Sequence, residues 1–357
     1  MYIHYIIIVT LFILGFIFNK NKFDKRVVLI LSILFMFIFS TFRDVSVGND
    51  TNEYVRVFNS FGGIDKLADN INSSRYELGY VLINTIIKTF TNNYTILLGI
   101  ISIIYLYSIY HFINKHSKSK WISIFLFYTL GIYFLIFNLL RQCIAISIFL
   151  YAIDFIINKN PIKYIISIFI ASLFHITALI LIPIYLFANK RINLISILSI
   201  IMIILAMLFC FDQIMNILIK IFPQYSRYYI SSKYAGTGVK LASIMQIMIS
   251  LFILVFGKLF YKKNNKLDRL EKMDVFENIQ IFNLCILIIS MKFNLLDRIS
   301  DYFLMIQAVY LSNVLSNVDS TFYLKNTLVI NISIIYITII QYFRPEWSGI
   351  FPYIFKK

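Results

Sequence analysis

The chain has 357 residues, of which 60% are hydrophobic and 14% are charged. Soluble domains contain about 45–50% apolar and about 25% charged residues, so this composition excludes an ordinary soluble protein. The formal net charge of +16 comes largely from short Lys clusters between apolar runs. That pattern is typical of cytoplasmic loops beside an anionic membrane surface and does not indicate nucleic-acid binding. The chain is therefore expected to be an integral membrane protein.

The apolar runs are continuous stretches of Ile, Leu and Phe, which favours helices over a β-barrel. A helical span needs ~20 apolar residues. The sequence thus predicts an all-α, polytopic fold with about 10–11 transmembrane helices in a single domain covering residues 1–357. The runs cover residues 2–18, 27–42, 95–113, 121–137, 139–156, 164–187, 192–210, 241–261, 276–291, 302–318 and 327–343.

The Lys-rich gaps set the expected orientation. Gaps such as 115–120 and 262–272 are expected in the cytoplasm, which places the first long loop, from Arg43 to Tyr76, outside. The segment 77–90 is too short and too polar to span the membrane well, and we expect it to form an amphipathic helix on the outer surface of the membrane. Residues 164–187 have basic gaps on both sides. They indicate a broken or re-entrant segment with His175 near its turn, and a plain span stays open.

Arginine is distributed differently from lysine. With this orientation of the chain in the membrane, seven of the ten Arg are expected outside or at the outer rim, against the positive-inside rule. Arg binds phosphate and carboxylate through paired N–H bonds, so the distribution predicts an outer cavity for an anionic ligand such as a lipid-linked phosphate. The alternative is that these residues pair with carboxylates of the loops. The seven are Arg43, Arg56, Arg75, Arg141, Arg227, Arg298 and Arg344.

The first outer loop, FRDVSVGNDTNEYVRVF, contains two carboxylates of interest. Asp50 precedes an expected helix and can cap it, or act in catalysis. Glu53 follows three residues later, at capping-box spacing. A Mg²⁺ site at Asp50 and Glu53 is weakly indicated, because the loop offers no third ligand. Further on, Arg75 and Glu77 lie beside the expected surface helix.

Four further segments place polar side chains near apolar runs. NLLRQCIA puts Asn138, Arg141 and Gln142 on one helix face, and SLFHITA contains His175, which either serves function or bonds a neighbouring helix. The loop QYSRYYISSKYAGTG suits sugar stacking or an aromatic belt. In LLDRISDYF, neighbouring Asp residues can neutralise the Arg. The candidates in these last two segments are Arg227, Tyr228, Arg298 and Tyr302.

The sequence contains no HExxH, no CxxC, no phosphate-binding Gly-rich loop and no G-x-S-x-G. The three cysteines are isolated in apolar runs and are expected to be ordinary core thiols. No metal and no cofactor are expected. Any donor substrate must therefore arrive already activated and carried on a lipid.

Several of these segments together resemble a family. GNDT followed by Tyr54, RYELGY, NLLRQCIA, SLFHITALIL, RISDYF and FPYIF are similar to segments of the EpsG family of Wzy-type polysaccharide polymerases. The resemblance implies a GT-C-like glycosyltransferase in the bacterial cytoplasmic membrane, acting at its outer face on undecaprenyl-pyrophosphate-linked oligosaccharides as donor and acceptor. It also implies membrane lipids, a flippase and a chain-length regulator as partners. The positions of interest are Arg43, Asp50, Glu77, Arg141, His175 and Arg298.

The expected reaction is a single displacement in which undecaprenyl pyrophosphate leaves. Arg141 and Arg298, helped by Arg43 or Arg75, are expected to bind the pyrophosphate. Asp50 or Glu77 is expected to act as base or to orient the acceptor hydroxyl. Asn138, Gln142 and His175 are expected to position phosphates or sugars. An O-antigen ligase or other lipid-donor transferase, a flippase of the lipid-linked unit and an outer-facing acyltransferase are the alternatives.

Overall fold

The computed structural model describes residues 2–20, 25–190, 194–221, 241–260, 267–292, 296–316, 322–345 and 348–356. Within these ranges the regular structure is helical, as predicted, and the β-type pairing is one isolated bridge, Arg43 with Phe355. Contacts divide the chain into two compact units, Met1–Ile182 with Ser312–Lys357, and Pro183–Leu311. Each unit is described by itself, and the expectation of a single domain stays a prediction.

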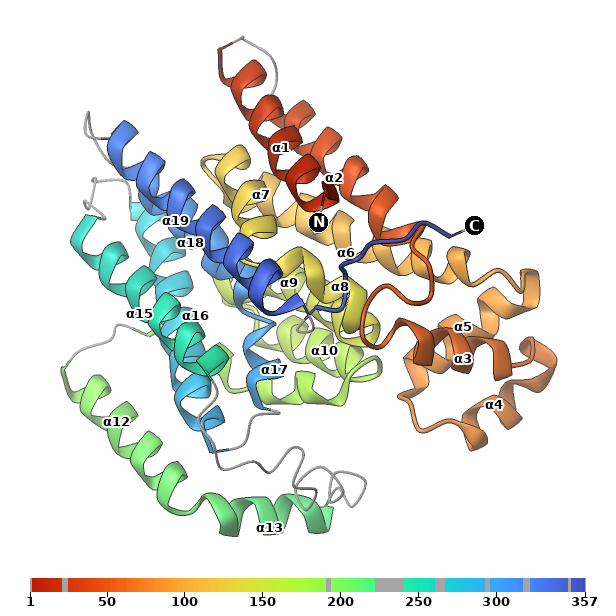
Figure 1. Ribbon diagram of the computed structural model, residues 1–357. Coiled ribbons are helices and arrows are strands. Elements are labelled where there is room, and N and C mark those ends of the chain that lie inside the picture. The colour runs from red at the N-terminus through yellow and green to blue at the C-terminus, as the bar shows by residue number, and fades with distance from the viewer. Residues whose placement is uncertain are drawn as a thin grey trace. The chain divides into compact units, whose positions relative to one another are not determined.

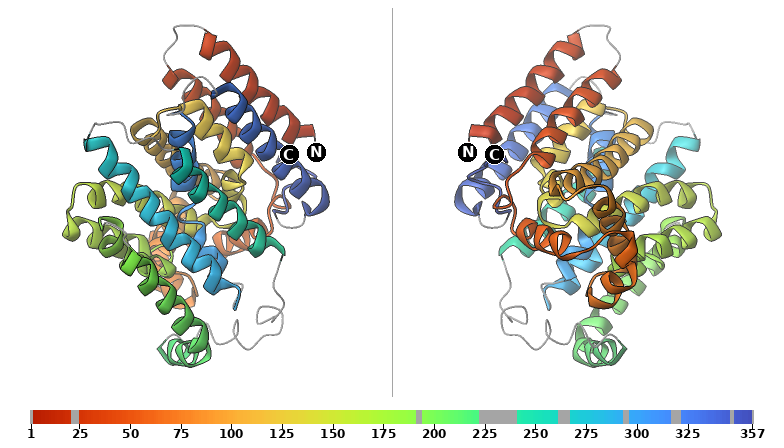
Figure 2. Two further views of the ribbon diagram at one scale, coloured as in Figure 1. Left: turned by 90° about the vertical axis from the view of Figure 1, so that its left-hand side faces the viewer. Right: turned by 90° about the vertical axis from the view of Figure 1, so that its right-hand side faces the viewer.

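The first unit begins with the hairpin of α1 (Tyr2–Lys20) and α2 (Lys25–Thr41), visible as the paired red helices of Figure 2. At its centre α6 (Tyr94–His116) packs on both α2 and α9 (Leu140–Ile157), as Figure 1 also shows. Its remaining helices are α3 (Thr51–Ser60), α4 (Leu67–Ser73), α5 (Leu78–Phe90), α6 (Tyr94–His116), α7 (Lys120–Thr129), α8 (Leu135–Asn138), α9 (Leu140–Ile157), α10 (Pro161–Ser172) and α19 (Phe322–Phe343), with 3₁₀ helices η1 (Ile64–Lys66), η2 (Ile132–Phe134) and η3 (Ile176–Leu181).

The second unit contains two longer helices, α15 (Leu241–Phe260) and α16 (Leu267–Ser290), which pack against each other. The helix α12 (Leu194–Phe209) continues into α13 (Phe211–Ile221) with a bend of 70° (Figure 1). Short helices α11 (Ile184–Ala188) and α17 (Asp297–Ser300) complete the unit. The helix α18 (Leu304–Leu315) runs across its boundary.

Three helices are long and apolar enough to cross a membrane: Tyr94–His116, Leu140–Ile157 and Lys272–Ser290. If each bent pair of helices counts as one span, the described residues contain up to five. The described residues therefore account for three to five of the ten or eleven expected spans, and the full number stays a prediction. The other apolar helices contribute described segments of 10–17 residues, and a helical segment of that length falls short of a hydrocarbon layer of about 30 Å.

Two of the predicted apolar runs are broken in the structure. The predicted run 121–137 bends by 60°, and Gly131 at the break has φ +81°, a conformation that favours glycine. The predicted run 164–187 is broken at His175, as one of its two interpretations expected. There α10 and η3 pack side by side, and the Tyr164 hydroxyl donates to Leu181 O across 2.6 Å. This contact closes a hairpin with His175 at its turn.

The predicted surface helix at 77–90 is present as α5, with 13 residues and one buried face. It lies in the first unit with α3 and α4, in the segment that follows α2 (Figure 1). Its place at the outer surface of a membrane stays a prediction. The capped start of α6 follows closely, because the Asn93 side chain accepts a bond of 3.1 Å from Thr95 N–H.

Candidate functional site

The candidate site lies in the first unit, where three interruptions of helical structure meet. Glu77 is the residue before α5, Arg141 lies in the first turn of α9, and His175 is the extended residue between α10 and η3. Arg141 Nη1 donates to Glu77 Oε2, and His175 Nδ1 lies 3.4 Å from Glu77 Oε1. The structure therefore joins three residues that the sequence singled out separately.

The three side chains are largely enclosed, with exposed fractions of 17% for Glu77, 19% for Arg141 and 12% for His175. The N–H of Ile176 also donates to Glu77 Oε1 over 3.2 Å. One carboxylate thus contacts a guanidinium, an imidazole and a backbone amide. An ion pair enclosed to this degree is stabilised by its hydrogen bonds and costs much to break.

A glycine permits this approach of α5 to the hairpin turn. Gly79 N–H donates to Leu173 O across 2.8 Å. A Cβ atom at Gly79 would lie 2.8 Å from the same carbonyl oxygen and 2.9 Å from the Phe174 ring. A larger residue at this position would move Glu77 away from His175, so the ELGY sequence places the carboxylate as well as providing it.

Aromatic rings line the same cluster. The Arg141 guanidinium carbon lies 4.4 Å from the ring centroid of Tyr76, and that of Arg75 lies 5.3 Å from it. Tyr76 in turn contacts Tyr80 and Tyr54, with ring centroids 5.5 Å and 6.3 Å away. Cation–π contacts of this kind hold a guanidinium in place without neutralising its charge. Tyr76 and Tyr54 were not among the predicted site residues, although Tyr76 stands between Arg75 and Glu77 in the sequence.

Electrostatics separate the roles of these groups. Burial raises the pKa of Glu77, but the hydrogen bond to His175 and the charge of Arg141 outweigh it and lower the pKa to about 2. Burial raises the pKa of the Tyr54 hydroxyl to about 12, with the charge of Arg141 opposing part of the rise. At neutral pH Glu77 is therefore a carboxylate and a weak base, and Tyr54 is neutral.

A second, more exposed group of charges borders the cluster. Glu53 accepts bonds of 2.9 Å from both Arg56 and Arg75, whose side chains are 74% and 62% exposed. Asp50 occupies the N-cap position of α3, but its side chain makes no capping bond. The capping box predicted for Asp50 and Glu53 is therefore absent, because Glu53 turns toward the two Arg instead. Three of the outer Arg thus pair with carboxylates, as the alternative interpretation expected.

Arg43 has a structural role, contrary to the expectation that it binds phosphate. Its side chain is fully buried and donates to Ser40 O, to Ile136 O over 3.1 Å and to the Thr51 hydroxyl over 3.3 Å. The guanidinium carbon also lies 4.7 Å from the Phe137 ring centroid. The guanidinium thus joins the end of α2 to α8, and none of its faces is open to a ligand.

Asn138 also connects segments of the first unit. Its Oδ1 accepts from Asn49 N–H over 2.6 Å, and its Nδ2 donates to Ser348 O over 2.9 Å. Beside it, Gly48 has φ +95°, and a Cβ there would lie 2.3 Å from Phe137 O. The GND turn is thus held against α8 by its backbone. Gln142, one residue after Arg141, is buried.

The other predicted residues lie in the second unit or outside the described residues. Arg298 and Tyr302 lie in the second unit, where Arg298 is exposed and Tyr302 is fully buried. Burial raises the pKa of the neighbouring Asp301 to about 7, and the charge of Arg298 opposes that rise. Arg227 and Tyr228 lie outside the described residues. No group of three or more His, Cys, Asp or Glu within the described ranges could hold a metal ion.

A comparison with protein families places this arrangement in context. The model of the EpsG family matches residues 26–355, nearly the whole chain. The chain belongs to the EpsG family. The match includes Glu77, Arg141 and His175 and confirms the resemblance found in the sequence motifs. No curated protein and no solved structure matches the chain.

Membership in the EpsG family indicates a glycosyltransferase-like polymerase of exopolysaccharide assembly. The apolar helices agree with a multi-pass membrane protein.

Proposed function

We propose that this EpsG-family chain is a polysaccharide polymerase that joins oligosaccharide units carried on undecaprenyl pyrophosphate, at the outer face of the cytoplasmic membrane. The observation that carries the proposal is the enclosed contact of Arg141, Glu77 and His175 at the start of a candidate membrane span. An ionisable cluster inside an apolar bundle is costly and usually serves function.

Arg141 is assigned to the leaving group. Its Nη1 is bonded to Glu77, while its Nε is buried and has no hydrogen-bond partner among the described residues. A guanidinium binds phosphate through parallel N–H bonds, and a buried donor without a partner is satisfied when a ligand bonds to it. Charge grows on the pyrophosphate as its bond to the sugar breaks, and a fixed cation at that position lowers the barrier.

His175 is assigned as the base, with Glu77 as the residue that orients it. A carboxyl group whose pKa is about 2 accepts a proton weakly at neutral pH. A histidine titrates near neutrality, and a carboxylate on one ring nitrogen orients the other toward a substrate. This division of roles replaces the expectation that Glu77 is the base. Asp50, which does not cap its helix, is the other carboxylate to test.

The reaction follows from these assignments. A hydroxyl at the non-reducing end of one lipid-linked unit attacks the anomeric carbon of the chain on the other lipid. The new glycosidic bond forms as the bond from that carbon to pyrophosphate breaks. The hydroxyl proton passes to His175, and undecaprenyl pyrophosphate leaves beside Arg141.

The test uses purified protein in liposomes with an undecaprenyl-pyrophosphate-linked repeat unit and no nucleotide sugar. We expect the wild type to produce a ladder of chain lengths. Arg141→Ala and His175→Ala are expected to lower the rate by about a hundredfold or more, since each removes a group that acts in the transition state. Arg56→Ala, which alters an exposed pair, is the matched control and is expected to keep most activity.

Two outcomes would overturn the proposal. Translocation of the intact unit without a new bond would identify a flippase. Transfer of a finished chain to a different carrier, with no ladder, would identify a ligase. Arg141→Lys separates binding geometry from charge, because lysine keeps the cation and loses the two parallel bonds.

A further inference from the structure

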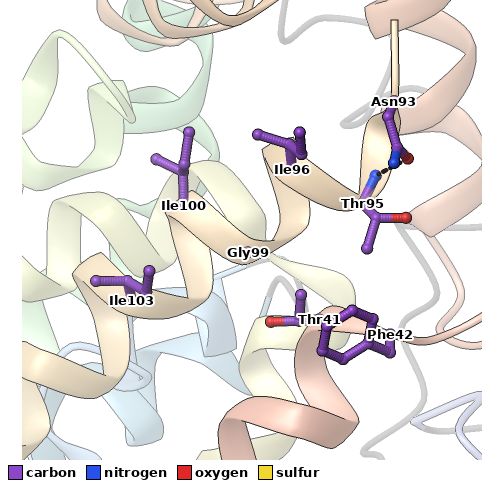
Figure 3. A pocket seen from close by; sticks show the side chains of 8 residues that line it. All are labelled: Thr41, Phe42, Asn93, Thr95, Ile96, Gly99, Ile100 and Ile103. Carbon is purple, nitrogen blue, oxygen red and sulfur yellow. Dashed lines mark hydrogen bonds between the residues drawn. The ribbon is translucent and has the colours of Figure 1, made fainter. Parts of the chain in front are cut away.

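A groove in the first unit lies apart from the cluster described above. It has a volume of about 310 Å³ and is open to the surface. The end of α2 supplies Thr41 and Phe42, and α6 supplies Ile96, Gly99 and Ile103 (Figure 3). Gly99 has no side chain to fill the groove, and a Cβ there would lie only 3.2 Å from the Thr41 methyl group.

The outer part of this groove faces away from the protein core. Phe42, Ile96 and Ile103 have exposed fractions of 48%, 43% and 55%. The helix α6 is a candidate membrane span by its length and composition, and apolar side chains exposed on such a span suit contact with lipid chains. An apolar groove at that place has the shape and chemistry to hold one hydrocarbon chain.

A cation lies at one end of the groove. Lys356 Nζ donates to Asn93 Oδ1 over 2.6 Å and to Thr95 Oγ1 over 2.8 Å, and both acceptors line the groove. It also lies 4.1 Å from the Tyr94 ring centroid. No carboxylate among the described residues is within ion-pair distance of this ammonium group. The same position is the N-terminus of α6, where helix amides favour an anion.

We propose that the groove holds the lipid of the acceptor substrate, with its pyrophosphate at Lys356 and its hydrocarbon chain along Thr41, Gly99 and Ile103. The inference rests on the proposed polymerase function, because joining two lipid-linked units requires that both lipids are held at once. Arg141 takes the phosphate of the donor. The second substrate brings the same chemistry, an apolar chain with an anionic head, and this groove offers the complementary pair of features.

The separation of the two sites agrees with this assignment. The helix α5 starts at the cluster, and three residues separate its end from Tyr94. Its 13 residues correspond to a length of roughly 20 Å. The acceptor reacts through the far end of its oligosaccharide, so its pyrophosphate has to be held at a distance from the reacting carbon.

The experiment separates the two substrates chemically. The donor probe is a lipid-linked unit whose acceptor hydroxyl is methylated, and the acceptor probe is joined to its lipid through a non-cleavable phosphonate. Initial rates in phosphatidylcholine liposomes give KM for each probe. Ile96→Trp fills the groove and Lys356→Glu reverses its charge. The matched control is Leu34→Trp, an exposed position on α2 that does not line the groove.

We expect both groove variants to raise KM for the acceptor probe about tenfold, the effect of one charge-assisted contact, with KM for the donor and kcat within twofold of wild type. Lys356→Arg is expected to restore the acceptor KM, and Leu34→Trp to leave it unchanged. An unchanged acceptor KM in both groove variants, or a raised donor KM, would overturn the inference while the polymerase function stands. A wild type that forms no glycosidic bond from the two probes would overturn the polymerase function and the acceptor site with it.

Discussion

The substitution Glu77→Gln tests the central contact, because it removes the charge between Arg141 and His175 at nearly constant volume. Both partners of the Glu77–Arg141 pair are less than one-fifth exposed, and breaking a buried pair costs about 3–5 kcal/mol. The pKa of Glu77 gives a second measure of how much this pair stabilises the fold. Burial raises the pKa of Glu77, but His175 and Arg141 outweigh it and lower the pKa from 4.5 to about 2. At about 1.4 kcal/mol per pH unit, this corresponds to about 3 kcal/mol.

The assay is equilibrium unfolding in mixed micelles, with wild type and variant compared from pH 7 to pH 2. We expect Glu77→Gln to lower the free energy of unfolding by about 3 kcal/mol at pH 7. A group with a lowered pKa stabilises the fold above its unfolded pKa and loses that effect as the pH falls through its folded pKa. The difference between the two proteins should therefore be constant above about pH 5 and shrink toward pH 2.

Glu53→Gln is the control, because Glu53 also pairs with Arg but its partners are mostly exposed. Exposed pairs are weakened by water and salt, so this variant should change stability much less. The reasoning would be refuted if Glu53→Gln were as destabilising as Glu77→Gln. It would also be refuted if the effect of Glu77→Gln did not depend on pH between 5 and 2.

Three further predictions concern the surroundings of the site. In the same assay, Arg43→Gln should lower the free energy of unfolding by about 2–4 kcal/mol, because it leaves buried carbonyl groups without donors. An unchanged free energy of unfolding would contradict the structural role of Arg43. Gly48→Ala should lower the free energy of unfolding by at least about 1–3 kcal/mol, since φ is +95° and the added Cβ approaches Phe137 O. An unchanged free energy of unfolding would show that the turn adapts to alanine. In the liposome assay, Tyr76→Leu should lower the initial rate about tenfold while Tyr76→Phe keeps most of the rate, because the ring face contacts Arg141. An equal loss of rate in both variants would assign the effect to the Tyr76 hydroxyl.

Much of the secondary structure could be predicted from hydropathy. The run 95–113 corresponds to α6 and the run 139–156 to α9, with ends that differ by a few residues. Long apolar runs determine helices because the backbone must satisfy its own hydrogen bonds in lipid. Hydropathy does not report where an apolar helix bends. The break at Gly131, inside the predicted run 121–137, was therefore not predicted.

For the site, residue chemistry alone was sufficient to single out Arg141, Glu77 and His175, because ionisable groups next to apolar runs are rare and costly. Sequence could not assign Arg43, whose buried guanidinium donates to Ile136 O, 93 positions away along the chain. Nor could it find Tyr76 as the ring against Arg141, since tyrosine is common at membrane boundaries.

The sequence by itself determined the membrane class, the family and the residues capable of binding an anion, because these depend on composition and on order along the chain. Only the tertiary structure decided which carboxylate pairs with which Arg. Glu77 and Arg141 are 64 positions apart, and Glu77 and His175 meet only because Gly79 allows α5 to approach the turn after α10. Pairing across such distances depends on how helices pack, and side-chain packing is a property of the folded chain.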